Sequence, residues 1–222
     1  MNTRVAERQT GRGGFITLEG LEGAGKSTAA AFVVERLSAA GYPVITTREP
    51  GGTQLGESLR ALLLARQTAM TGETELLLMF AARAEHLAQR ILPALAAGTW
   101  VVCDRFTDAS FAYQGGGRGL APSRVAALET WLQGDLQPDL TFLLDIDPGQ
   151  GLARARQRGD ALDRFESETL PFFERVREAY RQRALGDPGR IRVIDAGGHL
   201  AWVQTQLSGA MDEVFPVLRG LS

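Results

Sequence analysis

The 222-residue sequence is poor in several residue types, and each scarcity excludes a class of protein. Its only cysteine, Cys103, cannot form an internal disulfide, so the chain is not a disulfide-stapled domain and fits a reducing compartment. No apolar run reaches the roughly 18 residues that a membrane-spanning helix needs. The formal net charge of −2 argues against a broad surface for nucleic acid or anionic lipid. We therefore expect a cytoplasmic protein that binds neither nucleic acid nor membrane.

Two further scarcities concern the chemistry of the chain. His86 and His199 are the only histidines, and neither has a cysteine or a second histidine nearby, so we assign them no metal or general-base role. Lys26 is the only lysine among 24 basic residues. Since arginine supplies every other cation, position 26 is one where a compact ammonium group is needed.

Lys26 lies in a glycine-rich segment that fits the pattern G-x-x-x-x-G-K-[ST]. Apolar residues 15–18 precede the segment as a buried strand would, and residues 29–40 follow it with helical spacing up to Gly41. A glycine-rich loop between a strand and a helix surrounds phosphate groups with backbone N–H donors. We predict that Lys26 reaches the β- and γ-phosphates of a bound nucleotide and that the Ser27 hydroxyl coordinates Mg²⁺. The residues predicted to bind the nucleotide phosphates are Gly20, Leu21, Glu22, Gly23, Ala24, Gly25, Lys26, Ser27 and Thr28.

Strand-like and helix-like segments alternate along the rest of the chain. Further strands are predicted at 42–47, 100–105, 140–146 and 191–195. Further helices are predicted at 55–65, 73–97, 122–133, from 148 to a break at 159–164, at 166–185 and at 199–218. This alternation predicts an α/β fold of the P-loop NTPase type, with a five-stranded parallel sheet between two layers of helices. We expect a single domain over 14–222, preceded by a disordered tail over 1–13.

Charged residues stand where the predicted strands end, and open parallel sheets bind ligands beyond those ends. Arg48 and Glu49 follow the second strand, and Asp104 and Arg105 end the third. A carboxylate at the end of a buried strand is typical of a Walker-B acid, which lies near the metal. Asp147, in contrast, precedes a proline and is better explained as a helix cap.

Three other groups leave alternatives open. Phe80 and Arg83 share one face of a helix, but a phenylalanine is more often core and an arginine more often solvated. Ser110, Tyr113 and Gln114 precede a glycine run that requires unusual backbone angles or a close approach, and their side chains suit a polar ligand. The third group is four arginines around a break in helical periodicity, either a solvated face or a lid over about 154–166 that closes on phosphates. These are Arg154, Arg156, Arg158 and Arg164.

Together these motifs resemble those of bacterial thymidylate kinases, over nearly the whole chain from Gly14 onward. The matching segments are 20–28, Thr-Arg-Glu-Pro-Gly-Gly-Thr at 47–53, Asp-Arg at 104–105, Ala-Tyr-Gln-Gly-Gly-Gly-Arg-Gly at 112–119 and Asp-Arg-Phe-Glu at 163–166. The resemblance implies transfer of the γ-phosphoryl group of ATP to dTMP with Mg²⁺, giving dTDP for dTTP synthesis, and a homodimer. Gly23 stands where some family members carry a basic residue, so the chain resembles the type whose lid supplies the catalytic arginine.

The resemblance also implies residue roles. Phe80 would stack on the thymine ring, Arg83 would bond to its carbonyl, and Tyr113 would disfavour a ribose. The implied dTMP-binding residues are Glu22, Arg48, Phe80, Arg83, Arg105, Ser110, Tyr113 and Gln114. The implied catalytic residues are Lys26, Arg48, Arg105, Arg154 and Arg158, with Ser27, Asp104 and Glu49 near the metal and its waters.

Three rival functions can be weighed against this one. A kinase of the same core for another acceptor would not need Phe80, Arg83 and the Tyr113–Gln114 segment together. A GTP-dependent switch protein needs an Asn-Lys-x-Asp motif, which is impossible because the only asparagine is Asn2 and the only lysine is Lys26. A nucleotide-binding scaffold without catalysis would not need the full set of charged residues that the chain retains.

Overall fold

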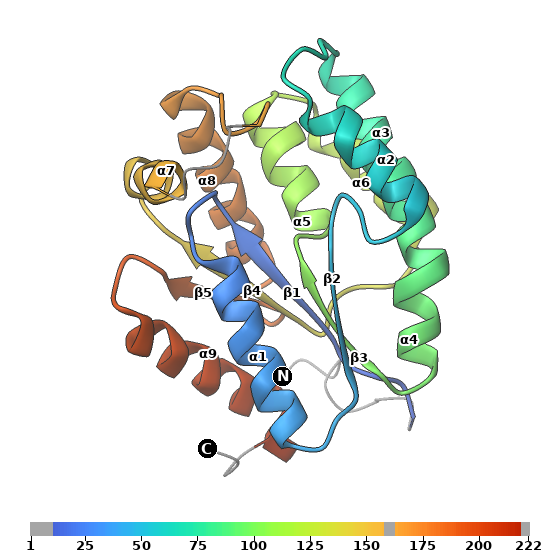
Figure 1. Cartoon of the computed structure of the whole chain (residues 1–222), viewed down its shortest axis with the longest axis vertical. Helices are drawn as coiled ribbons and strands as arrows, with labels where there is room; N and C mark the ends of the chain where they lie inside the picture. The colour runs from blue at the N-terminus through green and yellow to red at the C-terminus, as the bar shows by residue number, and fades with distance from the viewer. Residues whose placement is uncertain (1–10, 158–162, 219–222) are drawn as a thin grey trace.

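The computed structural model describes residues 11–157 and 163–218. Its centre is a parallel sheet of five strands in the order β2-β3-β1-β4-β5 (Figure 1). The strands are β1 (Phe15–Gly20), β2 (Val44–Arg48), β3 (Trp100–Asp104), β4 (Leu140–Asp145) and β5 (Ile191–Asp195). All neighbours pair in parallel, so every strand carries its carboxyl end to the same edge. The predicted α/β fold is confirmed, and β1 occupies the middle of the sheet.

Helices cover both faces of this sheet (Figure 1). One face packs against α1 (Lys26–Ala39) and α9 (Leu200–Val214). The other face packs against α4 (Leu92–Ala96), α5 (Thr107–Ser110) and α8 (Leu170–Gly186). The remaining elements are α2 (Gln54–Leu64), α3 (Gly72–His86), α6 (Pro122–Gln133), α7 (Pro148–Gln157), the π-helical segments η2 (Leu87–Ile91) and η3 (Phe111–Gly117), and the 3₁₀ turn η4 (Pro216–Leu218). Of the helices within the described ranges, none is long and apolar enough to cross a membrane.

The core follows from the strand sequences. All six residues of β1 are buried, as expected for a central strand that helices cover on both sides. Phe15 packs edge-on against Phe106 with ring centroids 5.0 Å apart, and Phe142 of β4 is fully buried. Burying aromatic side chains of this size contributes on the order of 2 kcal/mol each. The core therefore fixes β1, and with it the loop that leaves its carboxyl end.

Several segments differ from the sequence prediction, and the helix predicted over 199–218, for example, ends at Val214. α8 begins at Leu170 instead of residue 166, because Asp163 Oδ1 accepts hydrogen bonds from the N–H groups of Phe165 and Glu166 and forms a turn. Pro171 lacks an N–H group and is tolerated only in a first helical turn, so it places the helix start. The glycine-rich segment after Ser110 is helical, and its glycines allow a close approach to α8.

The amino-terminal boundary also differs from the prediction. Gly13 N–H donates to Leu95 O at 2.9 Å, and Arg12 pairs with Asp139. The ordered chain therefore includes the last three residues of the predicted tail, 11–13. Residues 1–10 lie outside the described residues.

Candidate active site

The loop between β1 and α1 has the geometry of a phosphate cradle. Gly23 and Gly25 adopt φ angles of +73° and +90°, which side-chain-bearing residues rarely adopt. A Cβ atom on Gly20 would lie 2.4 Å from Leu144 O, so only glycine lets β1 turn into the loop beside β4. Since α1 begins at Lys26, the loop's N–H groups and the helix N-terminus face the same site.

Lys26 lies under this loop and is buried. Its Nζ donates to Leu21 O at 2.9 Å and to Gly20 O at 3.2 Å. Burial, together with the positive charge of Arg105, lowers the pKa of Lys26 to about 8, against the opposing charges of Asp104 and Glu22. The site thus holds a desolvated ammonium group that an incoming phosphate would stabilise.

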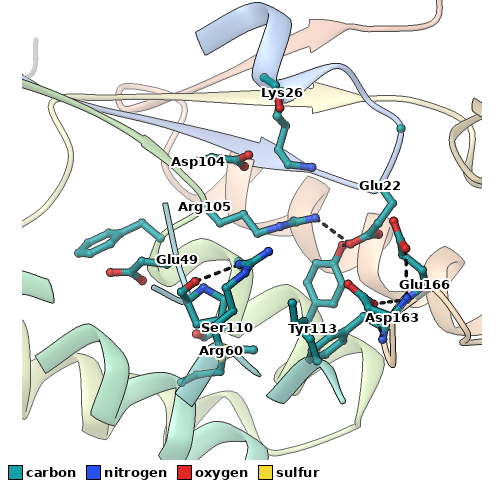
Figure 2. A pocket seen from close by; sticks show the side chains of 18 of the residues that line it. Glu22, Lys26, Glu49, Arg60, Asp104, Arg105, Ser110, Tyr113, Asp163 and Glu166 are labelled. Atoms are coloured by element: carbon teal, nitrogen blue, oxygen red, sulfur yellow. Dashed lines mark hydrogen bonds and ion pairs between the residues drawn. The ribbon is translucent and has the colours of Figure 1, made fainter. Parts of the chain in front are cut away.

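Arg105 has a left-handed backbone conformation, and hydrogen bonds hold its side chain in place. Its φ of +68° is the only positive value among the described non-glycine residues. Nη1 donates to Gly20 O at 2.7 Å, and Nη2 donates to Glu22 Oε1 at 2.8 Å (Figure 2). The guanidinium lies 5.0 Å from the ring centroid of Tyr113, whose hydroxyl donates to both Glu22 oxygens at 2.9 and 2.8 Å. Arg105, Tyr113 and Glu22 therefore form one hydrogen-bonded unit beside the loop.

The main chain on either side of Arg105 is also anchored to β1. The N–H of Arg105 donates to Leu18 O at 2.9 Å. The N–H of Phe106 donates to the buried carboxyl of Glu19 at 2.7 Å. Glu19 also accepts from Tyr180, whose hydroxyl lies 3.3 Å from Arg105 Nη1. These contacts hold the left-handed turn that directs Arg105 toward the loop.

Asp104 ends β3 beside β1, as the sequence predicts. Its Oδ1 is buried and has no hydrogen-bond partner within the described ranges. An unpartnered buried carboxylate oxygen next to a phosphate loop fits a water of a hydrated cation. Ser27, exposed at the start of α1, supplies a second oxygen. Over the described residues, no group of three or more histidine, cysteine or acidic side chains is placed to hold a metal ion.

Arg83 projects from α3 and is held on two sides. Nε donates to Glu49 Oε2 at 2.7 Å, and Nη2 donates to Phe106 O at 3.2 Å and to Ser110 Oγ at 3.1 Å. The remaining nitrogen, Nη1, is buried without a partner in the part of the chain that the structure describes. Glu49 Oε1 bonds to His86 Nδ1 at 2.9 Å. Both oxygens of Glu49 are engaged, so Glu49 anchors Arg83, and its predicted place near the metal stays a prediction.

These groups surround a cavity of about 450 Å³ (Figure 2). Lys26, Asp104 and Arg105 approach it from the sheet edge, and Ser110, with Arg60, lies across from them (Figure 2). The structure brings together at this cavity fourteen of the sequence-predicted residues: Glu22, Gly23, Gly25, Lys26, Ser27, Thr28, Glu49, Arg83, Asp104, Arg105, Ser110, Tyr113, Gln114 and Arg154. Gly20, Leu21 and Ala24 belong to the loop but do not line the cavity.

Other predicted residues lie elsewhere. Arg48 has a half-exposed side chain that pairs with Glu57 at 2.9 Å. Phe80 is buried among Leu76, Phe111 and Val125 and does not line the cavity.

The predicted lid arginines are split between several environments. Arg154 lines the cavity, but its Nη1 and Nη2 donate to Ala196 O at 2.9 Å and Gly197 O at 3.2 Å. Arg156 is exposed on α7, and Arg158 lies outside the described residues. Arg164 turns away from the cavity because its Nη1 pairs with the buried Glu75 at 2.7 Å. Its backbone N–H donates to Leu64 O at 3.1 Å, which ties this segment to α2.

The cavity also includes residues that the sequence analysis did not select. Arg60 and Leu64 share one face of α2, and Met79 is one helical turn before Arg83 on α3. Asp163 and Glu166 also line the cavity, beside Tyr113 and Glu22 (Figure 2). Helical spacing offered a signal for Met79, because positions three and four before Arg83 both share its face. The signal for Arg60 was its place on a helix that directly follows the strand-end loop at 48–53.

A phosphate loop at the carboxyl end of the central strand, facing converging arginines across one cavity, defines a P-loop nucleotide kinase. A family model described as thymidylate kinase matches residues 18–207. The chain belongs to the thymidylate kinase family.

Individual relatives agree with this assignment. The chain is 61% identical over 201 residues to the thymidylate kinase of Alkalilimnicola ehrlichii. This match covers 90% of this chain and 93% of the relative. It is 57% identical over 206 residues to the thymidylate kinase of Bordetella pertussis, covering 92% and 97%. The crystal structure of thymidylate kinase from Ehrlichia chaffeensis aligns with a TM-score of 0.73 and 34% identity, over 90% of this chain and 99% of that one.

Proposed function

We propose that this protein transfers the γ-phosphoryl group of ATP to dTMP, giving dTDP for dTTP synthesis, and that it requires Mg²⁺. The observation that carries the proposal is a single cavity lined both by the phosphate loop and by Arg83, Ser110 and Gln114, with Ser110 across from Lys26 (Figure 2). A donor phosphate and an acceptor nucleotide can therefore share one space. Membership in the thymidylate kinase family supports dTMP as the acceptor.

On the donor side, the loop's N–H groups and Lys26 bind the ATP phosphates. Ser27 and the unpartnered oxygen of Asp104 are the groups that would hold Mg²⁺ and its waters. The ion, when bound, neutralises charge on the transferred phosphoryl group. Asp104 also lies close enough to Lys26 to favour its charged form.

On the acceptor side, Arg105 orients the dTMP phosphate toward the loop, and Arg60 lines the same space. The acceptor oxygens are already anionic, so the transfer needs no strong general base, which agrees with the structural role of His86. Positioning and charge neutralisation supply the rate enhancement. Tyr113 and Glu22, bonded to each other, lie where the sugar would pass.

The thymine base lies against α3 in this proposal. Arg83 offers its unpartnered Nη1 to a base carbonyl. Met79 lines the cavity one turn before Arg83, whereas Phe80 points into the core. We therefore assign the contact with the face of the base to Met79, in place of the stacking role that the family resemblance suggested for Phe80.

The lid completes the site. A Cβ atom on Gly23 would lie 2.0 Å from Gly151 O of α7, so the loop has no room for a catalytic side chain there. An arginine must then come from elsewhere, and we propose Arg154, with Arg158 as a second predicted contributor. Arg154 must release Ala196 O and Gly197 O to reach a phosphate, which is the kind of movement that excludes water on closure.

We further propose that the protein acts in the cytoplasm as a single-domain chain that forms a homodimer. The single buried cysteine is compatible with a reducing compartment. Trp131 on α6 and Leu77 on α3 are strongly exposed apolar side chains on two helices that contact each other, which suits burial against a second copy.

The test is ADP release from ATP and Mg²⁺ with dTMP, dUMP, UMP, CMP, AMP and GMP as acceptors. We expect turnover with dTMP to exceed turnover with all the others. Omission of Mg²⁺ is expected to abolish it. Highest activity with a different acceptor would reject the assignment of Arg83, Tyr113 and Met79, and silence on the whole panel from a protein that binds ATP would reject catalysis.

A further inference from the structure

Glu75 of α3 is an acidic residue with an unusual environment outside the cavity. Its side chain is 1% exposed, and three side chains donate to it, two from η3 and its C-terminal end and one from the segment before α8. Gln114 Nε2 lies 2.7 Å from Oε1, Arg118 Nε lies 3.1 Å from Oε2, and Arg164 Nη1 lies 2.7 Å from Oε2. Two guanidinium groups compensate its charge, so the carboxylate is stable in this buried place.

This contact fixes the orientation of the Gln114 amide. A carboxylate can only accept hydrogen bonds, so the end of the amide that faces Glu75 must be the NH₂ group. Gln114 is itself 1% exposed and lines the cavity. No side chain or backbone group within the described ranges donates to its carbonyl oxygen, which leaves an acceptor for a ligand.

Arg83, near Gln114, offers a hydrogen-bond donor where Gln114 offers an acceptor. Ser110 lies one helical turn before Gln114 and accepts from Arg83 Nη2, which places Arg83 beside this turn. Its buried Nη1 has no partner among the described residues. The cavity wall therefore holds a fixed donor, Arg83, next to a fixed acceptor, Gln114.

This pair matches only one kind of pyrimidine. Thymine and uracil carry an acceptor at O4 and a donor at N3–H. Cytosine carries a donor at the 4-amino group and an acceptor at N3, so both contacts would be mismatched. A mismatch of this kind costs more than a lost hydrogen bond, because a buried polar group is left without a partner.

We propose that Glu75, which is remote from the substrate, is a specificity-determining positioning residue that selects 4-oxo over 4-amino pyrimidines by holding the Gln114 amide in one orientation. This inference rests on the proposed function, with the base of dTMP lying between Arg83 and Gln114. On this proposal, the buried ion pairs of Glu75 with Arg118 and Arg164 help to determine whether the site accepts a 4-oxo or a 4-amino pyrimidine.

The probe pair is dTMP and 5-methyl-dCMP, which differ only at position 4 and N3 of the base. Glu75→Gln keeps the shape but introduces an NH₂ group that can donate to the Gln114 carbonyl, so the Gln114 amide can turn and present its own NH₂ to the base. We expect the ratio of kcat/KM for dTMP to that for 5-methyl-dCMP to fall by roughly ten-fold or more. Glu75→Asp, which keeps an acceptor-only group, is expected to retain the preference for dTMP.

Two controls separate this role from a general structural one. Glu168→Gln removes the other carboxylate partner of Arg118 without touching Gln114, so it is expected to leave the ratio unchanged. A merely structural role of Glu75 would lower kcat/KM for both nucleotides alike, and an unchanged ratio in Glu75→Gln overturns the proposal.

Gln114→Met provides a test that does not depend on the folding of a Glu75 variant. Loss of the amide is expected to lower the same ratio, and an unaltered ratio would overturn the proposal as well. Equal use of dTMP and 5-methyl-dCMP by the unmodified protein would also overturn it. Absence of dTMP turnover in the unmodified protein would instead reject the proposed function, and this inference with it.

Discussion

Arg105 illustrates how the site places a single side chain. A left-handed backbone at a residue other than glycine costs on the order of 1–3 kcal/mol. Hydrogen bonds from the adjoining backbone to Glu19 and Leu18, together with the charge-assisted bond to Glu22, offset this cost. The guanidinium is therefore in place before any phosphate arrives, and little reorganisation is needed during transfer.

Loss of Arg105 or Lys26 should therefore reduce catalysis far more than stability. We expect Arg105→Ala and Lys26→Ala each to lower kcat by about 10²–10³-fold, because in the proposed reaction each removes a positive charge that faces the transferred or accepting phosphate. Steady-state kinetics with dTMP measures the effect, and circular dichroism checks the fold. Arg124→Ala is the matched control, since that arginine pairs with Glu73 on the surface, away from the cavity. Activity within threefold of the parent protein in either site variant would contradict the assigned role.

The buried carboxyl group of Glu19 has a shifted pKa, from which we predict how the free energy of unfolding depends on pH. Burial, with the nearby charge of Asp108, raises the pKa of Glu19 from 4.5 to about 8. Between these pH values the folded protein holds a proton that the unfolded chain releases. The contribution of Glu19 to the free energy of unfolding is thus fully present below pH 4.5 and is lost as pH rises through 8.

Glu19→Gln should remove this dependence, because an amide does not titrate. We expect the stability of the parent protein relative to Glu19→Gln to fall by up to about 1.4 kcal/mol per pH unit between pH 4.5 and 8. Urea denaturation at several pH values measures it, with the exposed Glu35→Gln as the control substitution. A difference that stays constant over this range would disprove the prediction.

Among the elements, the pairing of η3 with α8 depends on glycine. A Cβ atom on Gly116 would lie 2.5 Å from the Cβ of Ala179 and 2.9 Å from Arg175 O. The second of these is a backbone atom that cannot rotate away. The close approach brings Tyr180 of α8 beside Tyr113 of η3, with ring centroids 6.2 Å apart, and both side chains contact Arg105.

Gly116→Ala is therefore expected to lower the free energy of unfolding by about 1–3 kcal/mol, since the two helices must separate to admit the methyl group. Gly209→Ala is the matched control, because Gly209 lies within α9 and an added Cβ there would meet no atom within 4 Å. Replacing glycine within a helix at an open position is expected to stabilise by about 0.5–1 kcal/mol. Equal effects of the two changes in urea denaturation would contradict the packing argument.

For the whole molecule, the exposed apolar side chains bear on assembly. Trp131 of α6 is 84% exposed, and Leu77 of α3 is 58% exposed. If these helices form the proposed dimer interface, Trp131→Glu places a charge in it and should convert the dimer to a monomer. Sedimentation equilibrium measures the mass, and Leu185→Glu on α8, also strongly exposed, is the control. A dimer that survives Trp131→Glu with unchanged affinity would exclude α6 as the interface.

Features that depend on residues close together in the chain were predictable from the sequence alone. The phosphate loop at Gly20–Thr28, the alternation of strands and helices and the ends of α6 at Pro122 and Gln133 all follow from local patterns. Asp147 was predicted as a cap, and its Oδ1 accepts from Gln150 N–H at 3.1 Å. The expectations for strand ends were also met at Asp104 and Arg105, because parallel strands bring their carboxyl ends to one edge.

Only the tertiary structure decided how distant residues pair. Arg164 turns to Glu75, 89 positions away in the chain, and Glu49 is engaged by Arg83 and His86. Local spacing cannot rank such partners, because each charged side chain has many possible counter-ions. The same limit applies to α3, where Phe80 and Met79 both share a face with Arg83. The rotation of that helix against its neighbours, which buries Phe80 and turns Met79 to the cavity, is set by packing.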